Sequence, residues 1–124
     1  LILTALRRIV ATGYDGVYLD IVDAFQNFEF DPGTGGWRDH LTNLATGQSY
    51  RQDMIDWVQR IAVTAREKKP GFLVVPQNGT QLLETPSFLT TIDGVGVEDL
   101  FASWEKNSEP QDLLAALKPL VPMK

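Results

Sequence analysis

The chain has 124 residues, with 11 Lys and Arg against 16 Asp and Glu, and a formal net charge of −5 at neutral pH. Hydrophobic residues make up 44% and charged residues 22%, values typical of a globular domain that exclude a long disordered chain, a collagen or a coiled coil. There is no cysteine, which excludes disulfides and a thiolate metal site. The acidic balance argues against a general nucleic-acid binder, and no apolar run approaches the roughly 18 residues of a membrane span.

The first half of the chain predicts a helix, a strand and a long loop. Residues 1–12 carry apolar side chains at helical spacing and stop before Gly13, which predicts a helix. Residues 16–23 are apolar at consecutive positions, as expected for a strand covered on both faces. Residues 28–49 are rich in Gly, Pro and polar residues, so we expect a loop without regular structure that embeds several aromatic side chains.

The second half predicts an alternation of helices and strands. Residues 51–68 carry one apolar stripe, a basic C-terminal end and a Pro-Gly stop, and they are the strongest helix prediction. The remaining predicted elements are a second strand, a short helical stretch interrupted at Pro86, a third strand and a last helix, at residues 72–75, 80–91, 92–98 and 110–118.

This order of elements predicts an α/β fold with parallel strands joined by helical crossovers. A (β/α)8 barrel uses about 250 residues for eight units, so a chain of this length corresponds to about half a barrel. We therefore expect a partial (β/α)8 TIM barrel of about three parallel strands and four helices, truncated at both ends. Residues 1–124 would then be an internal fragment of a single barrel domain. A complete flavodoxin-like sandwich is the alternative, although its glycine-rich phosphate loop is missing after the first strand.

Polar side chains follow each predicted strand, at the end where parallel α/β folds bind their ligands. The first strand supplies Asp20 and Asp23, the second Gln77 and Asn78, and the third Glu98. Two carboxylates from different strands are the usual equipment for glycosidic hydrolysis, in which one is ionised and the other is protonated. Asp20 and Glu98 are the pair we expect to be catalytic, because each directly follows an apolar strand.

Each of these residues also has a structural interpretation. An aspartate after a strand often caps the next helix, and this applies to Asp23 more than to Asp20. Gln77 and Asn78 could be simple turn residues. Asp99 follows Glu98 directly and is expected to point elsewhere and to be structural.

Aromatic and metal-binding side chains leave further alternatives open. Trp37 and Trp104 lie near loops at the expected ligand end, where an indole could stack on a sugar ring or pack in the ordinary way. The carboxylates after the strands could hold magnesium or calcium through oxygen ligands. The single histidine, His40, lies in the long loop and favours neither a zinc site nor a histidine-based triad.

Three motifs at the predicted strand ends resemble a known family. They are GYDGVYLDIVDA at residues 13–24, VPQNG at 75–79 and IDGVGVEDLF at 92–101. In this order they resemble glycoside hydrolase family 114, the endo-α-1,4-polygalactosaminidase-like (β/α)8 barrels. The helix at 51–68, with Arg66 near its end, also resembles the family.

The resemblance implies a secreted or surface-associated hydrolase of galactosamine-containing polysaccharides that needs no cofactor. It implies that Asp20 is the nucleophile and Glu98 the acid/base of a retaining mechanism, with Asp23, Gln77 and Asn78 lining the sugar site. Two alternatives stay open, a carbohydrate-binding barrel without catalysis and a metal-dependent lyase or aldolase barrel. Because a half barrel exposes strand edges, the isolated chain is expected to be inactive, and poorly soluble or dimeric.

Overall fold

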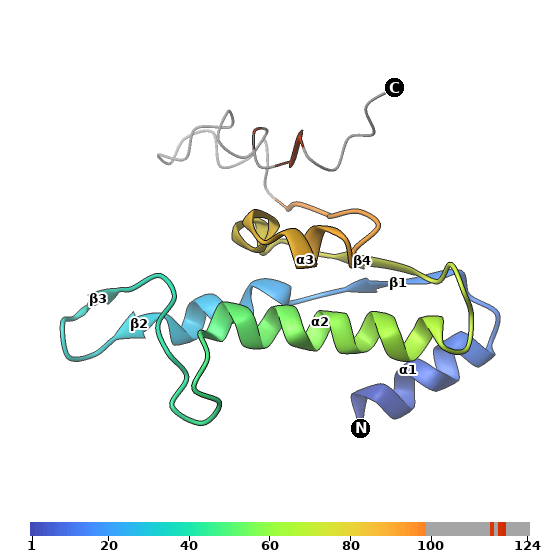
Figure 1. Ribbon diagram of the computed structural model, residues 1–124, viewed down its shortest axis with the longest axis horizontal. Helices are drawn as coiled ribbons and strands as arrows, with labels where there is room; N and C mark the ends of the chain where they lie inside the picture. The colour runs from blue at the N-terminus through green and yellow to red at the C-terminus, as the bar shows by residue number, and fades with distance from the viewer. Residues whose placement is uncertain (99–114, 116, 119–124) are drawn as a thin grey trace.

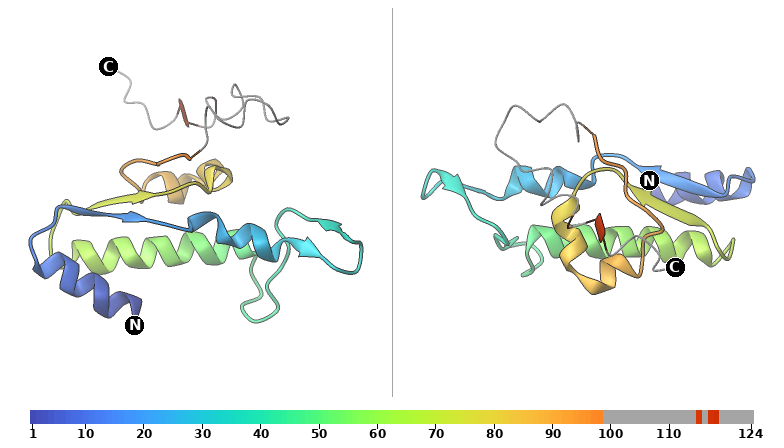
Figure 2. Two further views of the ribbon diagram at one scale, coloured as in Figure 1. Left: turned by 180° about the vertical axis from the view of Figure 1, so that it is seen from behind. Right: turned by 90° about the horizontal axis from the view of Figure 1, so that it is seen from above.

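A computed structural model describes residues 1–98, 115, 117 and 118 of the chain (Figure 1). The elements in chain order are α1 (Ile2–Ala11), β1 (Gly16–Leu19), the 3-10 helix η1 (Val22–Phe28), β2 (Phe30–Asp31), β3 (Gly36–Trp37), α2 (Tyr50–Arg66), β4 (Leu73–Pro76), the 3-10 helix η2 (Thr80–Glu84) and α3 (Pro86–Leu89). The long helix α2 runs beneath β1 and β4, while α1 and the β2–β3 hairpin lie at opposite ends of the long axis (Figure 2).

The prediction of a partial (β/α)8 TIM barrel is wrong. The described residues form two small sheets of two strands each, the parallel pair β1–β4 and the antiparallel pair β2–β3. In this part of the chain there is no barrel-like arrangement of parallel strands. Two expectations led to the error, a third strand at residues 92–98 and a loop without strands at residues 28–49.

Residues 92–98 run beside β4 in parallel, yet they do not form a strand. Only Gly96 makes a ladder bridge, to Gln77. Two glycines in this run weaken strand formation, since glycine has no side chain to pack and loses much backbone freedom. A Cβ atom at Gly96 would collide with the ring end of Tyr18, which reaches over from β1, so any larger residue there would have to displace the Tyr18 side chain.

Residues 28–49 contain a short hairpin where no regular structure was expected. Phe30 pairs with Trp37, and their rings pack edge to face at 5.4 Å. The turn between the two strands is closed by Asp31, whose side chain accepts a hydrogen bond from the Gly33 amide at 2.9 Å. A hydrogen bond from Arg38 also lowers the pKa of Asp31. The turn residues therefore connect two strands instead of preventing them.

The two main helix predictions are confirmed. α1 buries Leu6 and Val10 against Ile61 and Ala65 in the C-terminal half of α2, and Gly13, with φ of 97°, follows the end of α1. α2 begins at Ser49, whose hydroxyl accepts a hydrogen bond from the Gln52 amide at 3.1 Å. This contact satisfies one of the free amides of the first turn, as expected for an N-terminal serine cap.

The main core lies between α2, β4, η1 and the η2–α3 segment. Its most deeply buried side chains include Val58, Val74, Leu82 and Phe88. The short helical stretch predicted within residues 80–91 is confirmed together with its interruption, since η2 ends at Glu84 and Pro86 begins α3. The predicted last helix lies outside the described residues except for positions 115, 117 and 118, and Asp99 and Trp104 also lie outside them.

None of the helices in the described part of the chain is long and apolar enough to cross a membrane.

Candidate functional site

The chain segments that carry the predicted site residues end side by side. The Gln77 amide donates to the Leu19 carbonyl at 2.8 Å, so the residue after β4 lies next to the end of β1. The Asn78 amide donates to the Gly96 carbonyl at 2.7 Å, which joins the third segment to the same edge. Asp20, Gln77, Asn78 and Glu98 therefore follow three neighbouring, parallel segments at their carboxyl ends.

Asn78 and Glu98 are in direct contact. The Asn78 amide nitrogen Nδ2 lies 3.3 Å from Glu98 Oε2, and the Glu98 backbone amide donates to Asn78 Oδ1 at 3.0 Å. Asn78 has a φ of 60°, a left-handed conformation that asparagine tolerates better than most residues. The next residue, Gly79, is also left-handed and lies against Val22 at the start of η1. This turn after β4 holds the backbone of Glu98, while the Glu98 carboxylate stays exposed.

Asp20 lies at the point where β1 stops. Its Oδ1 accepts a hydrogen bond from the Ile21 amide at 2.9 Å, and its side chain is exposed. Ile21 has a φ of 61° and is 63% exposed. A left-handed β-branched residue is a genuine outlier, and such strain is concentrated at functional sites. The turn also explains why β1 ends at Leu19 and not at position 23 as predicted, because Val22 then enters the core.

The other predicted site residues are spread more widely. Gln77 is 8% exposed and Asp23 is half-buried in the first turn of η1, where it makes no capping hydrogen bond. Trp37 is 66% exposed and pairs with Phe30 on the hairpin, which projects beyond η1 (Figure 1). The structure therefore gathers Asp20, Gln77, Asn78 and Glu98, whereas Trp37 belongs to a different part of the surface.

A pocket of about 230 Å³ opens beside Asp20 and Ile21. Its other walls are mostly apolar side chains of α1 and α2, among them Ile2, Met54 and Trp57. Gln77, Asn78 and Glu98 do not line this pocket, so it extends from the Asp20 side of the edge towards α2.

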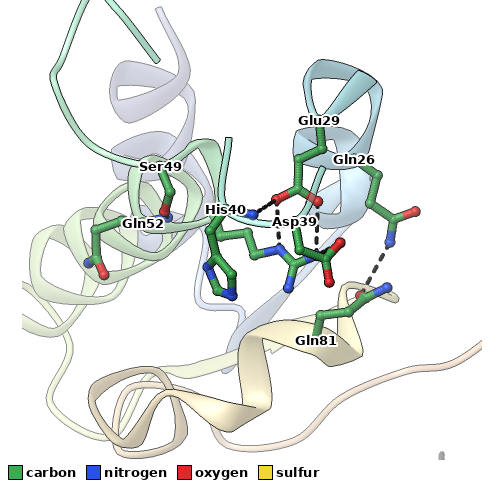
Figure 3. A network of polar contacts seen from close by, with 8 residues as sticks. Gln26, Glu29, Asp39, His40, Ser49, Gln52 and Gln81 are labelled. Atoms are coloured by element: carbon green, nitrogen blue, oxygen red, sulfur yellow. Dashed lines mark hydrogen bonds and ion pairs between the residues drawn. The ribbon is translucent and has the colours of Figure 1, made fainter. Parts of the chain in front are cut away.

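A buried ion pair that the sequence analysis missed joins the residue after η1 to the first turn of α2 (Figure 3). Arg51 Nε lies 2.7 Å from Glu29 Oε1 and Arg51 Nη2 lies 2.9 Å from Glu29 Oε2, and both residues are less than 8% exposed. Glu29 Oε1 also accepts a hydrogen bond from the His40 backbone amide at 2.9 Å, and Asp39 lies 2.8 Å from the guanidinium. The hydrogen bond to Glu29 raises the pKa of Arg51.

One sequence signal could have revealed this pair. Arg51 lies in the first turn of α2, where the helix dipole disfavours a cation. A basic residue in that position indicates a specific carboxylate partner. Nothing in the local sequence says which carboxylate it is, because Glu29 lies 22 positions earlier.

In the part of the chain that the structure describes, no group of three or more His, Cys, Asp or Glu side chains is arranged to hold a metal ion. The His40 residue is exposed and left-handed, with φ of 60°.

The described residues define a small α/β unit with polar side chains at the carboxyl ends of adjacent parallel segments. No family model matches the chain. It is 33% identical over 99 residues to an uncharacterized protein of Deinococcus radiodurans, a match of 80% of this chain and 27% of that protein. It is 31% identical to an uncharacterized protein of Thermotoga maritima, over 82% of this chain and 28% of that protein.

A third similarity covers the whole chain. An uncharacterized protein of Methanocaldococcus jannaschii is 30% identical over 128 aligned positions, which span 100% of this chain and 34% of that protein. The chain thus spans about a quarter to a third of the length of the curated relatives it matches.

Proposed function

We propose that the protein is a glycoside hydrolase that cleaves α-1,4-linked galactosamine-containing polysaccharide outside the cell or at its surface. The observation that carries the proposal is that β1, β4 and the segment at residues 92–98 end side by side. Asp20 lies on one side of this edge, and the contact between Asn78 and Glu98 lies on the other. The resemblance of three motifs to glycoside hydrolase family 114 supports it through these same residues. The support comes from the site residues alone, since the described residues do not form the barrel that this resemblance implied.

The proposed mechanism divides the work between two carboxylates. Asp20 attacks the anomeric carbon, and Glu98 protonates the leaving oxygen and then activates the water that releases the sugar. Asn78 holds the backbone of Glu98 and, with Gln77, can hydrogen-bond sugar hydroxyl groups. The net charge of −5 suits a cationic amino sugar, because an acidic protein attracts a cationic substrate at long range.

The test is the release of reducing ends from polygalactosamine by the full-length protein. Asp20→Asn and Glu98→Gln each keep the side-chain shape and remove the acid–base or nucleophilic group. Each is expected to lower kcat on the order of a thousandfold, within the usual range for a lost general acid. Asp56→Asn is the control, since it removes an equally exposed carboxylate from α2. Unchanged turnover in Glu98→Gln would sink the assignment.

A carbohydrate-binding role without catalysis is the second candidate. It is favoured by the exposure of both carboxylates, because the acid of a glycosidase usually depends on burial for its protonated state. This role predicts that the wild-type protein binds polygalactosamine without cleaving it. It also predicts that binding survives in the Asp20→Asn, Glu98→Gln double variant, whereas a hydrolase would show turnover in the wild type.

A further inference from the structure

A separate pocket of about 470 Å³ lies between η1, the loop before α2 and the first two turns of α2. Its size falls within the range of small-molecule sites. The residues of the proposed hydrolase site, Asp20, Gln77, Asn78 and Glu98, do not line it. What it can bind is therefore argued from its own lining.

Aromatic rings form much of the pocket wall. Phe28 at the end of η1 and Tyr50 at the start of α2 stack at a centroid distance of 5.2 Å with an interplanar angle of 23°. Trp57, two turns further along α2, adds a third aromatic side chain. Aromatic faces carry partial negative charge and attract cations as well as apolar groups.

One side chain in the wall is a carboxylate, Asp53. Its Oδ2 accepts hydrogen bonds from Asn43 Nδ2 at 2.7 Å and from the Thr46 hydroxyl at 2.9 Å, and its Oδ1 accepts one from Gln48 Nε2 at 3.3 Å. All three donors are neutral, so they orient the carboxylate and leave its negative charge in place. A carboxylate has about four acceptor positions, which leaves room for a further donor on Oδ1.

The charges around the pocket are also negative on balance. Both arginines of residues 28–57 are already engaged, Arg51 by Glu29 and Arg38 by Asp31. No ion pair among the described residues engages Asp53 or its neighbour Asp56. A ligand that enters here therefore meets aromatic faces and an oriented carboxylate whose charge is not neutralised.

We propose that this pocket binds an organic cation, a protonated primary amine on a compact apolar body. The ammonium group donates to Asp53 Oδ1, and the apolar body lies against Phe28, Tyr50 and Trp57. Charge complementarity selects this ligand class over neutral apolar molecules, which would desolvate the carboxylate without neutralising its charge. None of the four residues of the proposed hydrolase site lines this pocket, although its wall shares Met54 and Trp57 with the pocket beside Asp20, so binding here can be tested apart from the proposed hydrolase activity.

The test uses two probes of nearly the same shape on the full-length protein labelled with ¹⁵N. Cyclohexylammonium is a cation at pH 7 and cyclohexanol is its neutral counterpart. We expect cyclohexylammonium to shift the Trp57 indole and the Phe28 and Tyr50 amide signals in a saturable way. We expect cyclohexanol to bind about fivefold or more weakly, as the loss of one charge contact at a partly exposed site predicts.

Two variants complete the test. Asp53→Asn keeps the shape of the side chain and is expected to bring the affinity for cyclohexylammonium down to that for cyclohexanol. Asp56→Asn removes the same charge one helical turn further along α2, at a residue that does not line the pocket. It is expected to leave the affinity for cyclohexylammonium within twofold of the wild-type value. Equal binding of the two probes to the wild type, or no saturable shift with either, would overturn the proposal whatever the variants do. Unchanged cation binding by Asp53→Asn would overturn it as well.

Discussion

At the scale of single residues, two left-handed backbones shape the edge where β1 and β4 end. Asn78, with φ of 60°, uses its side chain to hold Glu98, and its residue type is one that accepts this conformation. Ile21 also has a left-handed backbone, with φ of 61°, but a branched side chain is disfavoured in this conformation. Its side chain is 63% exposed. The strain at Ile21 is therefore maintained by the surroundings, next to the carboxylate that we propose as the nucleophile.

Replacing Ile21 by glycine should stabilise the fold and weaken the activity. The left-handed conformation costs a non-glycine residue about 1–2 kcal/mol, and the greater freedom of unfolded glycine offsets about 0.5–1 kcal/mol of the gain. We expect the free energy of unfolding of Ile21→Gly to rise by about 0.5–1 kcal/mol in chemical denaturation. Activity should fall, because a looser backbone positions Asp20 less well.

The control for this variant is Ile9→Gly in α1. That residue is also partly exposed, at 37%, but it lies in a regular helix. The same substitution there should lower the free energy of unfolding by about 1 kcal/mol. A loss of stability in Ile21→Gly comparable to the loss in Ile9→Gly would contradict the assignment of strain.

At the scale of elements, one buried ion pair holds η1, the loop before α2 and α2 together. Glu29 ends η1, Arg51 begins α2, and Asp39 and His40 belong to the loop between them. Apart from Arg51, the side chains in this cluster belong to segments with little regular structure of their own. The guanidinium, which donates to two segments at once, gives the loop a defined position on α2.

Removing the guanidinium should destabilise the protein strongly. Arg51→Met leaves Glu29 buried with only the His40 amide as a partner, and breaking a buried pair in this way costs about 3–5 kcal/mol. We expect the free energy of unfolding to fall by roughly that amount, and backbone amides of residues 38–49 to exchange faster with solvent.

Two further variants separate the buried pair from an ordinary surface contact. Arg38→Met removes an exposed pair with Asp31 and should cost less than about 1 kcal/mol. The double variant Glu29→Leu, Arg51→Met should regain part of the loss, because it leaves no unpaired buried charge. If Arg38→Met and Arg51→Met cost the same, the buried pair has no special role.

At the scale of the whole molecule, β1 pairs with β4 alone among the described residues, which leaves the other edge of β1 without a strand from that part of the chain. A groove of about 160 Å³ lies there, between α1 and three consecutive strand residues, Val17, Tyr18 and Leu19. Consecutive strand residues point to opposite faces, so a pocket that contacts all three lies at the strand edge. Ile2 and Ile9 of α1 also line the groove and are 57% and 37% exposed.

This edge should make the 124-residue chain self-associate. Unpaired strand edges beside exposed apolar side chains promote pairing with another chain. We expect sedimentation velocity to show association that increases with protein concentration, and Ile9→Lys to reduce it by placing a charge in the groove. Val63→Lys is the matched control, since it changes a residue of α2 that is 59% exposed and does not line the groove. A monomer at all concentrations would contradict this expectation.

The sequence by itself determined α1, α2, β4 and the turns that end them, because these elements depend on side-chain spacing and caps within a few residues. It also placed Asp20, Gln77, Asn78 and Glu98 after their segments. Only the tertiary structure decided the rest, since each remaining feature depends on partners far apart in the chain. Tyr18 packs against Gly96, at the single bridge beside β4. Arg51 pairs with Glu29 and fixes the position of the loop before α2. Local patterns do not encode such contacts, and for this reason the predicted barrel gave way to two small sheets.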